Sequence, residues 1–398
     1  MNDVVAVADV HEGINFGFNM DVETGISERA LDIHKNLVKA AEFAIDNHSK
    51  LFVIAGDLFD RTHISPTYRE MIRKDVIEPL GKNNVGIWIL AGNHDQPHSS
   101  KKGTSIDDFR GYPHVSVYRE PSVEEIVVEG KKVRCLIMPY MHPDSIALMV
   151  KKKLEKDIPP EQMFTTGQKL IKNWLAKKSE AEADYKILFA HYYIEGAKIR
   201  ETTYPEILPG EFSFTKDMIP DNLDIAVFGH IHLHQSMGKI GNTEVVYTGA
   251  VERIDWGERE DPKGFISLSV KEKKWDFVKL PVRDMIKINV DIKPDEEPNE
   301  KILKSIPDAS RKMIRLEITL PEGFRARVSD DKINEKLKNA FYYDIRWIET
   351  TKEKIGLISF TTNPYELLKE FIELNYADDH RKDEILNEGN NILKEVLE

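Results

Sequence analysis

The sequence predicts an α/β fold with at least two domains, and three observations lead to this expectation. Five short apolar runs occur between residues 4 and 228, each of the length of a buried strand: VVAVA, LFVIA, IWILA, KILFA and DIAVF. Segments with apolar residues at helical spacing lie between some of these runs. The chain has 398 residues, of which 41% are hydrophobic, so it exceeds one typical hydrophobic core.

The first strand is followed by an expected amphipathic helix from Ser27 to about His48. Apolar residues at helical spacing mark its buried face: Ile33, Leu37, Ala41, Ala44 and Ile45. Ser65 and Pro66 form a helix start, with a cap and a first-turn proline. Residues 151 to about 180 are Lys-rich and helical, and such a charge run is typical of a solvated face. The short strands EVVYT, FISLSV and WDFVKL, between Thr243 and Leu280, predict a second sheet behind the first.

The residues after Leu280 predict a smaller α+β domain followed by a helical tail. The segment KPDEEPNE, residues 293–300, is rich in proline and acid and lacks periodicity, which indicates an exposed loop or linker. Around it lie MIKINVDI, MIRLEITL, a helix through DKINEKLKNAF, and strands near DIRWIE and KIGLISF. Two amphipathic helical stretches end the chain, and they either pack on their own domain or dock onto a partner. We therefore expect three parts, residues 1–282, 283–362 and 363–398.

Composition narrows the class of protein. No apolar run approaches the ~18 residues of a membrane span, and no signal segment precedes the first strand, so we expect a cytoplasmic protein without a membrane partner. Cys135 is the only cysteine, which excludes a thiolate-bound zinc site, and we expect it to be a buried strand residue. The net charge of −12 argues against a polyanionic substrate. Residues 363–398 hold half of that charge, however, with ten acidic and four basic side chains.

Polar residues with metal-binding side chains follow the five apolar runs directly. Because these runs are expected strands, the polar residues collect at strand ends, where an α/β sheet forms its ligand crevice. The candidate ligands are Asp9, His11, Asp57, Asn93, His191, His230 and His232. Imidazole, carboxylate and carboxamide groups without thiolate suit divalent manganese, iron or zinc. Seven ligands are too many for one catalytic ion, so they predict two ions with a bridging carboxylate, an arrangement that catalyses phosphoryl displacement.

The order of these blocks, D-x-H, G-D-x-x-D, G-N-H-D, a lone His and G-H-x-H, resembles the calcineurin-like metallophosphoesterase superfamily. The resemblance implies a two-sheet sandwich flanked by helices. It also implies two groups of ligands and one bridge: Asp9, His11 and His232; Asn93, His191 and His230; and Asp57 between them. His94 matches the histidine that binds no metal and stabilises or protonates the leaving oxygen. Asp95 is expected to orient the His94 imidazole.

Within that superfamily, the blocks GDLFDRTHISPTYRE, AGNHDQP and YTGAVERIDWGE resemble the SbcD nuclease family, the counterpart of the eukaryotic meiotic-recombination nuclease. The resemblance implies a manganese-dependent exonuclease on duplex DNA and endonuclease on single strands, acting in double-strand-break repair. It further implies a homodimer formed through helices after the GDLFD and GNHD blocks, a cap that positions DNA ends, and C-terminal helices that bind an SbcC-type ABC ATPase. Some archaeal members have His where this chain has Asp60, so the balance of exonuclease and endonuclease action is left open.

Two alternatives to a DNA nuclease stay open. Another enzyme of the superfamily, acting on small phosphate esters or cyclic nucleotides, needs no DNA-length groove, and the residues after Leu280 would then be unexplained. A scaffold that has lost catalysis would be recognised by its metal content. Near the candidate ligands, His234 is expected to be a bystander and Arg61 a surface residue, while Asp60 supports a ligand, faces the substrate or is structural.

Overall fold

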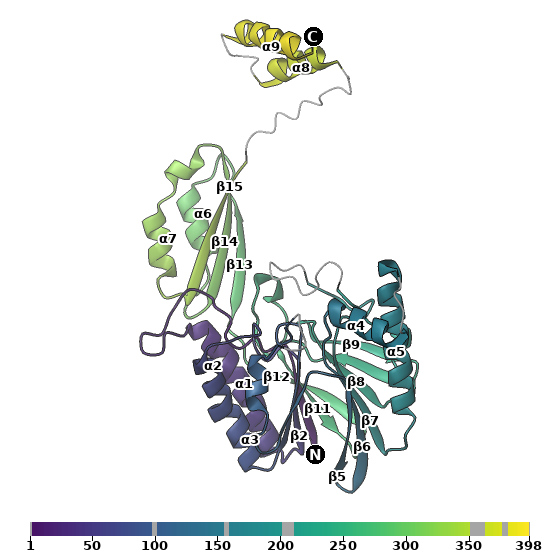
Figure 1. The fold of residues 1–398 in the computed structure, drawn as a ribbon. Helices are drawn as coiled ribbons and strands as arrows, with labels where there is room; N and C mark the ends of the chain where they lie inside the picture. The colour runs from purple at the N-terminus through teal and green to yellow at the C-terminus, as the bar shows by residue number, and fades with distance from the viewer. Residues whose placement is uncertain are drawn as a thin grey trace. The chain divides into compact units, whose positions relative to one another are not determined.

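A computed structural model describes residues 2–97, 102–154, 159–200, 211–350, 363–375 and 381–397 of the chain. They belong to two compact units, Met1–Met285 and Ile286–Glu398 (Figure 1). The division lies close to the expected boundary after residue 282, and the further division at residue 363 stays a prediction. Within the described ranges, no helix combines the length and the apolar character that a membrane crossing requires.

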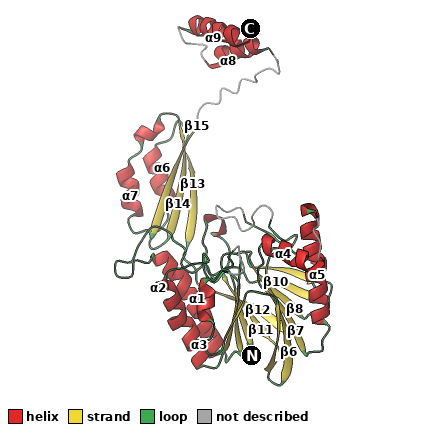
Figure 2. Cartoon of the chain, in the orientation of Figure 1, coloured by secondary structure: helices red, strands yellow, loops and turns green. Residues whose placement is uncertain are grey.

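The first unit contains two six-stranded sheets, drawn in yellow in Figure 2. The first sheet is ordered β12 (Lys274–Lys279), β11 (Gly264–Ser269), β1 (Val4–Val7), β2 (Leu51–Ala55), β3 (Gly86–Leu90) and β4 (Val115–Tyr118). Strands β1 to β4 are parallel, and β11 pairs antiparallel with both β1 and β12. The second sheet is ordered β5 (Ser122–Val128), β6 (Lys131–Met138), β7 (Tyr185–His191), β8 (Ile225–Gly229), β10 (Thr243–Tyr247) and β9 (Gln235–Ile240). Its four central strands are parallel and its two edge strands antiparallel.

The expectation that the three strands between Thr243 and Leu280 form the second sheet together is wrong for two of them. EVVYT is β10 of the second sheet, but FISLSV and WDFVKL are β11 and β12, which extend the first sheet beyond β1. All residues of β11 are buried, as are those of β1. A strand that is buried on both faces carries no sign in its sequence of which sheet it joins.

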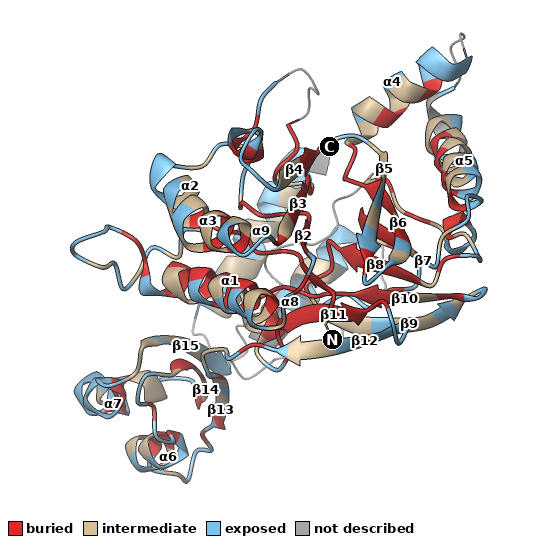
Figure 3. Ribbon diagram, turned by 90° about the horizontal axis from the view of Figure 1, so that it is seen from below, coloured by how far each residue is buried: buried red, intermediate tan, exposed pale blue. Residues whose placement is uncertain are grey.

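Three apolar cores stack the first unit into helix, sheet, sheet and helix layers. The core between the sheets includes Val53 and Trp88 from one sheet and Cys135, Phe189 and Val227 from the other. Cys135 is fully buried in β6, which confirms the sequence expectation. The other two cores pack helices against the outer face of each sheet. The central strands are accordingly coloured as buried in Figure 3.

The outer helical segments are α1 (Glu28–Asp46), α2 (Pro66–Ile72), the π-helix η1 (Arg73–Ile77), α3 (Glu78–Lys82), α4 (Pro143–Leu154) and α5 (Pro160–Ser179). The expected helix after Ser27 is confirmed, and the Ser27 side chain caps it by accepting from the Arg29 N–H. Pro79 has no N–H to donate, so the α-helical bond to the carbonyl of Asp75 cannot form, and the π-helix η1 precedes that position. The Lys-rich segment includes the end of α4 and all of α5, with Pro159 and Pro160 at the start of α5.

The second unit has a three-stranded sheet of order β13 (Met285–Asp291), β14 (Met313–Pro321) and β15 (Tyr342–Thr350), with helices α6 (Pro298–Ser305) and α7 (Asp330–Leu337) packed on it. KPDEEPNE is a loop only in part, because its last three residues begin α6 and Glu297 caps that helix. The strand expected near KIGLISF lies outside the described residues.

The C-terminal segment of this unit has the two expected helices, α8 (Pro364–Asn375) and α9 (Lys382–Leu397). They approach each other closely at Gly389, where an added Cβ would lie 2.7 Å from a methyl group of Leu368. Short 3-10 helices complete the described elements: η2 (Ser105–Phe109), η3 (Lys216–Met218), η4 (Trp256–Glu258) and η5 (Phe324–Arg327).

Candidate metal centre

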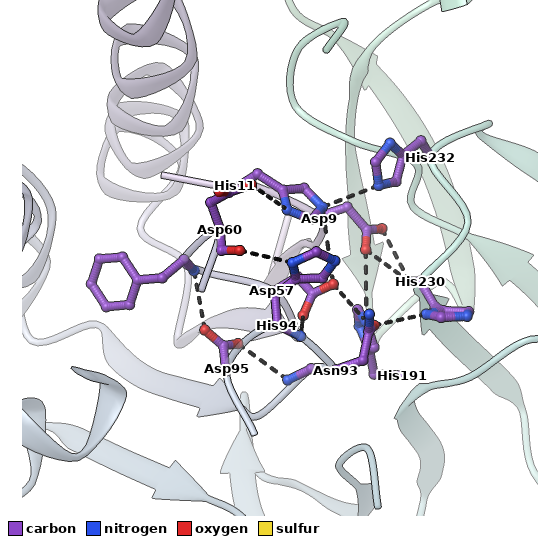
Figure 4. Close-up of polar contacts among 12 residues, drawn as sticks. Asp9, His11, Asp57, Asp60, Asn93, His94, Asp95, His191, His230 and His232 are labelled. Carbon is purple, nitrogen blue, oxygen red and sulfur yellow. Dashed lines mark hydrogen bonds and ion pairs between the residues drawn. The ribbon is translucent and has the colours of Figure 1, made fainter. Parts of the chain in front are cut away.

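The structure brings all seven predicted ligands together at the carboxyl ends of five strands. Asp9 and His11 follow β1, Asp57 follows β2 and Asn93 follows β3, while the second sheet contributes the remaining histidines from β7 and β8: His191, His230 and His232. Figure 4 shows their side chains pointing toward one another. Because both sheets contribute, the site lies where their parallel strands end together.

The donor atoms can be sorted into the two groups that the family resemblance implies, although Asp9 Oδ1 is also 3.9 Å from His191 Nε2 and His94 lies close to His11 and Asp57. In the first, Asp9, His11 and His232 have donor atoms within 4.8 Å of one another, and the Nε2 atoms of the two imidazoles are 3.1 Å apart. In the second, Asn93 Oδ1 lies 3.0 Å from His191 Nε2 and 2.9 Å from His230 Nδ1.

Asp57 lies between the two groups. Its Oδ2 is 3.9 Å from His11 Nε2 in the first group and 3.2 Å from His191 Nε2 in the second. The carboxylate is therefore placed to bridge two ions, one in each group. The metal-binding roles of the seven residues remain proposals that rest on this geometry.

Hydrogen bonds behind His191 and His232, and an ion-pair contact behind His230, lie on the side of each ring away from the centre. His191 Nδ1 is 2.8 Å from the Ala55 carbonyl, which can only accept, so Nδ1 carries a hydrogen and Nε2 is the nitrogen that could bind a metal ion once it loses its proton. His232 Nδ1 is 2.9 Å from Glu258 Oε1, and His230 Nε2 is 3.3 Å from Glu211 Oε1. Metal-bound histidines generally donate their outer N–H to such a carbonyl or carboxylate.

Burial and charge make this cluster unfavourable without a cation. Burial raises the pKa of Asp9, and burial together with neighbouring imidazoles lowers the pKa of His11 and His230. Burial also acts to lower the pKa of His191, but the Asp57 carboxylate outweighs it and raises that pKa to about 9. Carboxylates and imidazole lone pairs converge here with little access to water, so the residues fit a site for divalent cations.

Glycines before three of the ligands allow the loops to approach so closely. A Cβ at Gly56 would lie 2.0 Å from His191 Nδ1, and one at Gly92 would lie 2.1 Å from Asp57 Oδ1. At Gly229 it would meet the Ala55 carbonyl at 2.5 Å. The glycines of G-D, G-N and G-H are therefore part of the site.

Four of the ligands also have backbones in the left-handed region, which few residues other than glycine adopt: Asp9 (φ 51), His11 (φ 53), Asp57 (φ 51) and His230 (φ 91). Such strain persists only where surrounding contacts hold the chain, and it concentrates at functional sites. One such contact is the backbone N–H of His230, which donates to both carboxylate oxygens of Asp9 at 2.9 and 3.1 Å.

His94 lies beside the ligands but is only half-buried, so its imidazole is accessible to a substrate. Its backbone N–H donates to Asp57 Oδ1 at 2.8 Å, which links it to the bridging position. Its ring Nδ1 is 2.8 Å from the carbonyl oxygen of Asp60. Nδ1 therefore carries a hydrogen, and Nε2 is the nitrogen that can exchange a proton with a substrate.

The expectation that Asp95 orients the His94 imidazole is wrong. The buried Asp95 carboxylate instead accepts from the backbone N–H groups of Leu58, Phe59 and Gly92, each at 3.1 Å. It thus holds the loop after β2 against the loop after β3. Burial, and next the charge of Asp57, raise the pKa of Asp95 to about 7.

The neighbouring residues behave largely as expected. Asp60 Oδ1 is 3.8 Å from His11 Nδ1, and its other oxygen pairs with the exposed Arg61 at 3.0 Å. His234 stacks on Phe277 with ring centroids 3.7 Å apart, and its Nδ1 is 2.8 Å from the Tyr247 carbonyl. Asp60 thus lies beside His11, and the contacts of His234 are with Phe277 and Tyr247, but the roles of both residues stay predictions.

The sequence reasoning missed three residues that contact candidate ligands: Glu211, Glu258 and Lys263. Glu258 lies in the YTGAVERIDWGE block, but its separation of 26 residues from His232 follows no motif spacing. Burial acts to raise the pKa of Glu258, but Lys263 and His232 outweigh it and hold the pKa below its ordinary value.

Comparison with known proteins gives one family and several relatives. The model of the calcineurin-like phosphoesterase family matches residues 3–234. The DNA double-strand break repair protein Mre11 of Archaeoglobus fulgidus is 23% identical over 329 residues, covering 76% of this chain and 67% of that protein. Mre11 of Nanoarchaeum equitans is 24% identical over 383 residues, covering 94% and 92%. The SbcD component of the nuclease SbcCD of Staphylococcus epidermidis is 25% identical over 245 residues, covering 59% of this chain and 60% of that protein.

Proposed function

Since the chain belongs to the calcineurin-like phosphoesterase family, we propose that it is a metal-dependent nuclease that hydrolyses phosphodiester bonds of DNA in double-strand-break repair. The observation that carries the proposal is the convergence of seven ligand side chains, six of them buried, beside the half-buried His94. The relatives add support for DNA as the substrate, because two are named double-strand break repair proteins and one a component of a nuclease.

The centre would hold two divalent ions, for which we propose manganese. Asp9, His11 and His232 would hold one ion, and Asn93, His191 and His230 the other, with Asp57 bridging. When bound, the ions supply Lewis acidity for an in-line displacement at phosphorus. Contacts to Ala55, Glu211 and Glu258 would keep the rings of His191, His230 and His232 in place for the ions.

His94 would act on the leaving group. The Asp60 carbonyl holds Nδ1, so Nε2 can stabilise or protonate the departing 3′ oxygen. Because His94 is tied to Asp57 through its backbone, the ring keeps a fixed position relative to the phosphate that the ions would bind.

The part of the chain after residue 282 is proposed to position DNA and to bind a partner protein. We propose residues 283–362 as the part that positions DNA and residues 363–398 as the segment that binds an SbcC-type ABC ATPase. The helices α8 and α9 expose apolar side chains that support a docking role, among them Phe371, Ile392 and Val396. We also propose a homodimer through the helices after the GDLFD and GNHD blocks, exonuclease and endonuclease activity, and a cytoplasmic location.

The proposal is tested by incubating the purified protein with manganese and either linear duplex DNA or p-nitrophenyl phosphate. We expect degradation of the DNA by the natural chain and the loss of most of that activity in His94→Gln, with metal content unchanged. Full activity in His94→Gln would remove His94 from the mechanism. Hydrolysis of the small ester alone would favour a phosphomonoesterase, and a chain without bound metal would favour the non-catalytic scaffold.

A further inference from the structure

A buried ion pair lies directly behind one of the candidate ligands. Glu258 and Lys263 are each 1% exposed, and Lys263 Nζ is 2.8 Å from Glu258 Oε2. The other oxygen of Glu258 is 2.9 Å from His232 Nδ1. Neither residue belongs to the five metal-ligand blocks, although Glu258 is the last residue of YTGAVERIDWGE.

The pair holds His232 at two points. Glu258 accepts from the imidazole, and Lys263 donates to the backbone carbonyl of His232 at 3.0 Å. Glu258 is itself fixed by the backbone N–H of Ile254, at 3.1 Å from Oε2. The ring therefore has one orientation and one tautomer, with Nε2 directed at His11 Nε2 and the Asp9 carboxylate.

Stability alone does not explain this arrangement. A buried ion pair loses hydration on both partners, and replacing one by apolar residues of similar volume is often neutral or stabilising. A charged carboxylate behind a metal-binding imidazole has a different effect, because it fixes the ring and makes its facing nitrogen a stronger electron donor. The position of Glu258 on His232 thus indicates action on the metal rather than on the fold.

We propose that Glu258 is a positioning residue that sets the affinity of the ion held by Asp9, His11 and His232, with Lys263 keeping the carboxylate in place. The inference rests on the proposed metal centre. It assigns Glu258 an effect on one of the two ions only, because the outer ring nitrogens of the histidines in the other group face Ala55 and Glu211 instead.

The test is a titration of the metal-free, full-length protein with Mn²⁺, followed by calorimetry and by the electron paramagnetic resonance signal of free Mn²⁺. We expect two ions to bind the natural chain. Glu258→Gln removes the charge but keeps the size of the side chain. It should lower the binding affinity for one ion by about 10- to 100-fold and leave the affinity for the other unchanged.

Glu252→Gln is the matched control, because it makes the same change in another buried ion pair, with Arg29, while Glu252 bonds to Arg29, Asn36 and Arg253 and not to a candidate ligand. We expect it to lower the melting temperature at least as much as Glu258→Gln does, while both ions still bind with affinities near those of the natural chain. Unchanged binding in Glu258→Gln, or equal loss of affinity in both variants, would overturn the proposal.

If Glu258→Gln folds poorly, the double variant Glu258→Gln/Lys263→Met removes both charges. The double variant should regain stability while its affinity for the weakly bound ion stays low. If stability and affinity were both regained, the role of Glu258 would be purely structural. The readout is independent of DNA. A natural chain that binds two ions but leaves DNA intact would refute the nuclease proposal alone, whereas a chain that binds no ions would refute the metal centre.

Discussion

Replacing Gly56 with alanine would disturb the loop after β2 that carries Asp57, and the structure allows the loss of stability to be worked out. The residue has a φ of +100°, and the new methyl group would lie 2.0 Å from His191 Nδ1, well inside an ordinary contact distance of 3.4 Å. His191 would have to leave the Ala55 carbonyl, to which it now bonds at 2.8 Å. The ring would then no longer present Nε2 to Asn93 and Asp57.

Two costs add at this position. A non-glycine residue in a left-handed conformation costs about 1 to 2 kcal/mol. Leaving buried polar groups of His191 and Ala55 without their partner costs about 1 to 3 kcal/mol more. Gly56→Ala should therefore lower the free energy of unfolding by about 2 to 5 kcal/mol and lower the binding affinity for one of the two Mn²⁺ ions.

Gly17→Ala is the matched control, because Gly17 also has a positive φ, of +69°, but an added Cβ there meets no atom within 4 Å. Gly17→Ala should lower the free energy of unfolding only by the conformational cost of about 1 to 2 kcal/mol, and both Mn²⁺ ions should bind as they do to the natural chain. The measurements are urea unfolding of the metal-free proteins and Mn²⁺ titration. Equal effects of the two substitutions, or normal metal binding in Gly56→Ala, would refute the role given to this glycine.

Two further predictions concern stability. Removing divalent ions with a chelator should lower the melting temperature, since ions at 100 times their dissociation constant add about 2.7 kcal/mol each to the folded state, and an unchanged melting temperature would count against the centre. Burial acts to lower the pKa of His34, but bonds to Glu12 and Asp75 outweigh it and raise the pKa overall. The stability from His34 is thus fully present below its ordinary pKa of about 6.5 and lost as the pH rises through the higher folded value. In chelator, the stability difference between the natural chain and His34→Gln should shrink from pH 6 to pH 9, and a constant difference would contradict the assignment.

The ligand loops could be predicted from the sequence because the two features that mark them, a buried strand and the metal-binding side chains after it, lie within a few residues of each other. A buried strand needs consecutive apolar residues, and a metal needs particular side chains, so Asp57 after LFVIA or His230 after DIAVF is recognised within a few positions. The order of the five blocks then identifies the family without any knowledge of which strands pair. The family resemblance in turn implies that Asp9 and His232 lie beside each other, as they do in the structure.

The residues that support the ligands could not be predicted in this way, because distant contacts select them. Glu258 contacts His232 from 26 residues further along the chain, and its carboxylate carries no sign of that contact in the sequence. Asp95 was misassigned for the same reason. It is adjacent to His94 in sequence, yet its carboxylate is used by three backbone N–H groups of the loops around it.

These supporting contacts explain how strained ligand loops can exist in a stable fold. Asp9, Asp57 and His230 adopt left-handed backbones that each disfavour folding by about 1 to 3 kcal/mol. Asp95 offsets part of this by satisfying three buried N–H groups, and Asp9 itself accepts the N–H of His230. Because side chains and backbone hold one another, the ligand atoms already converge within the protein. Ions would therefore bind without first ordering the loops, and the folding energy of the two sheets maintains the geometry that phosphodiester hydrolysis requires.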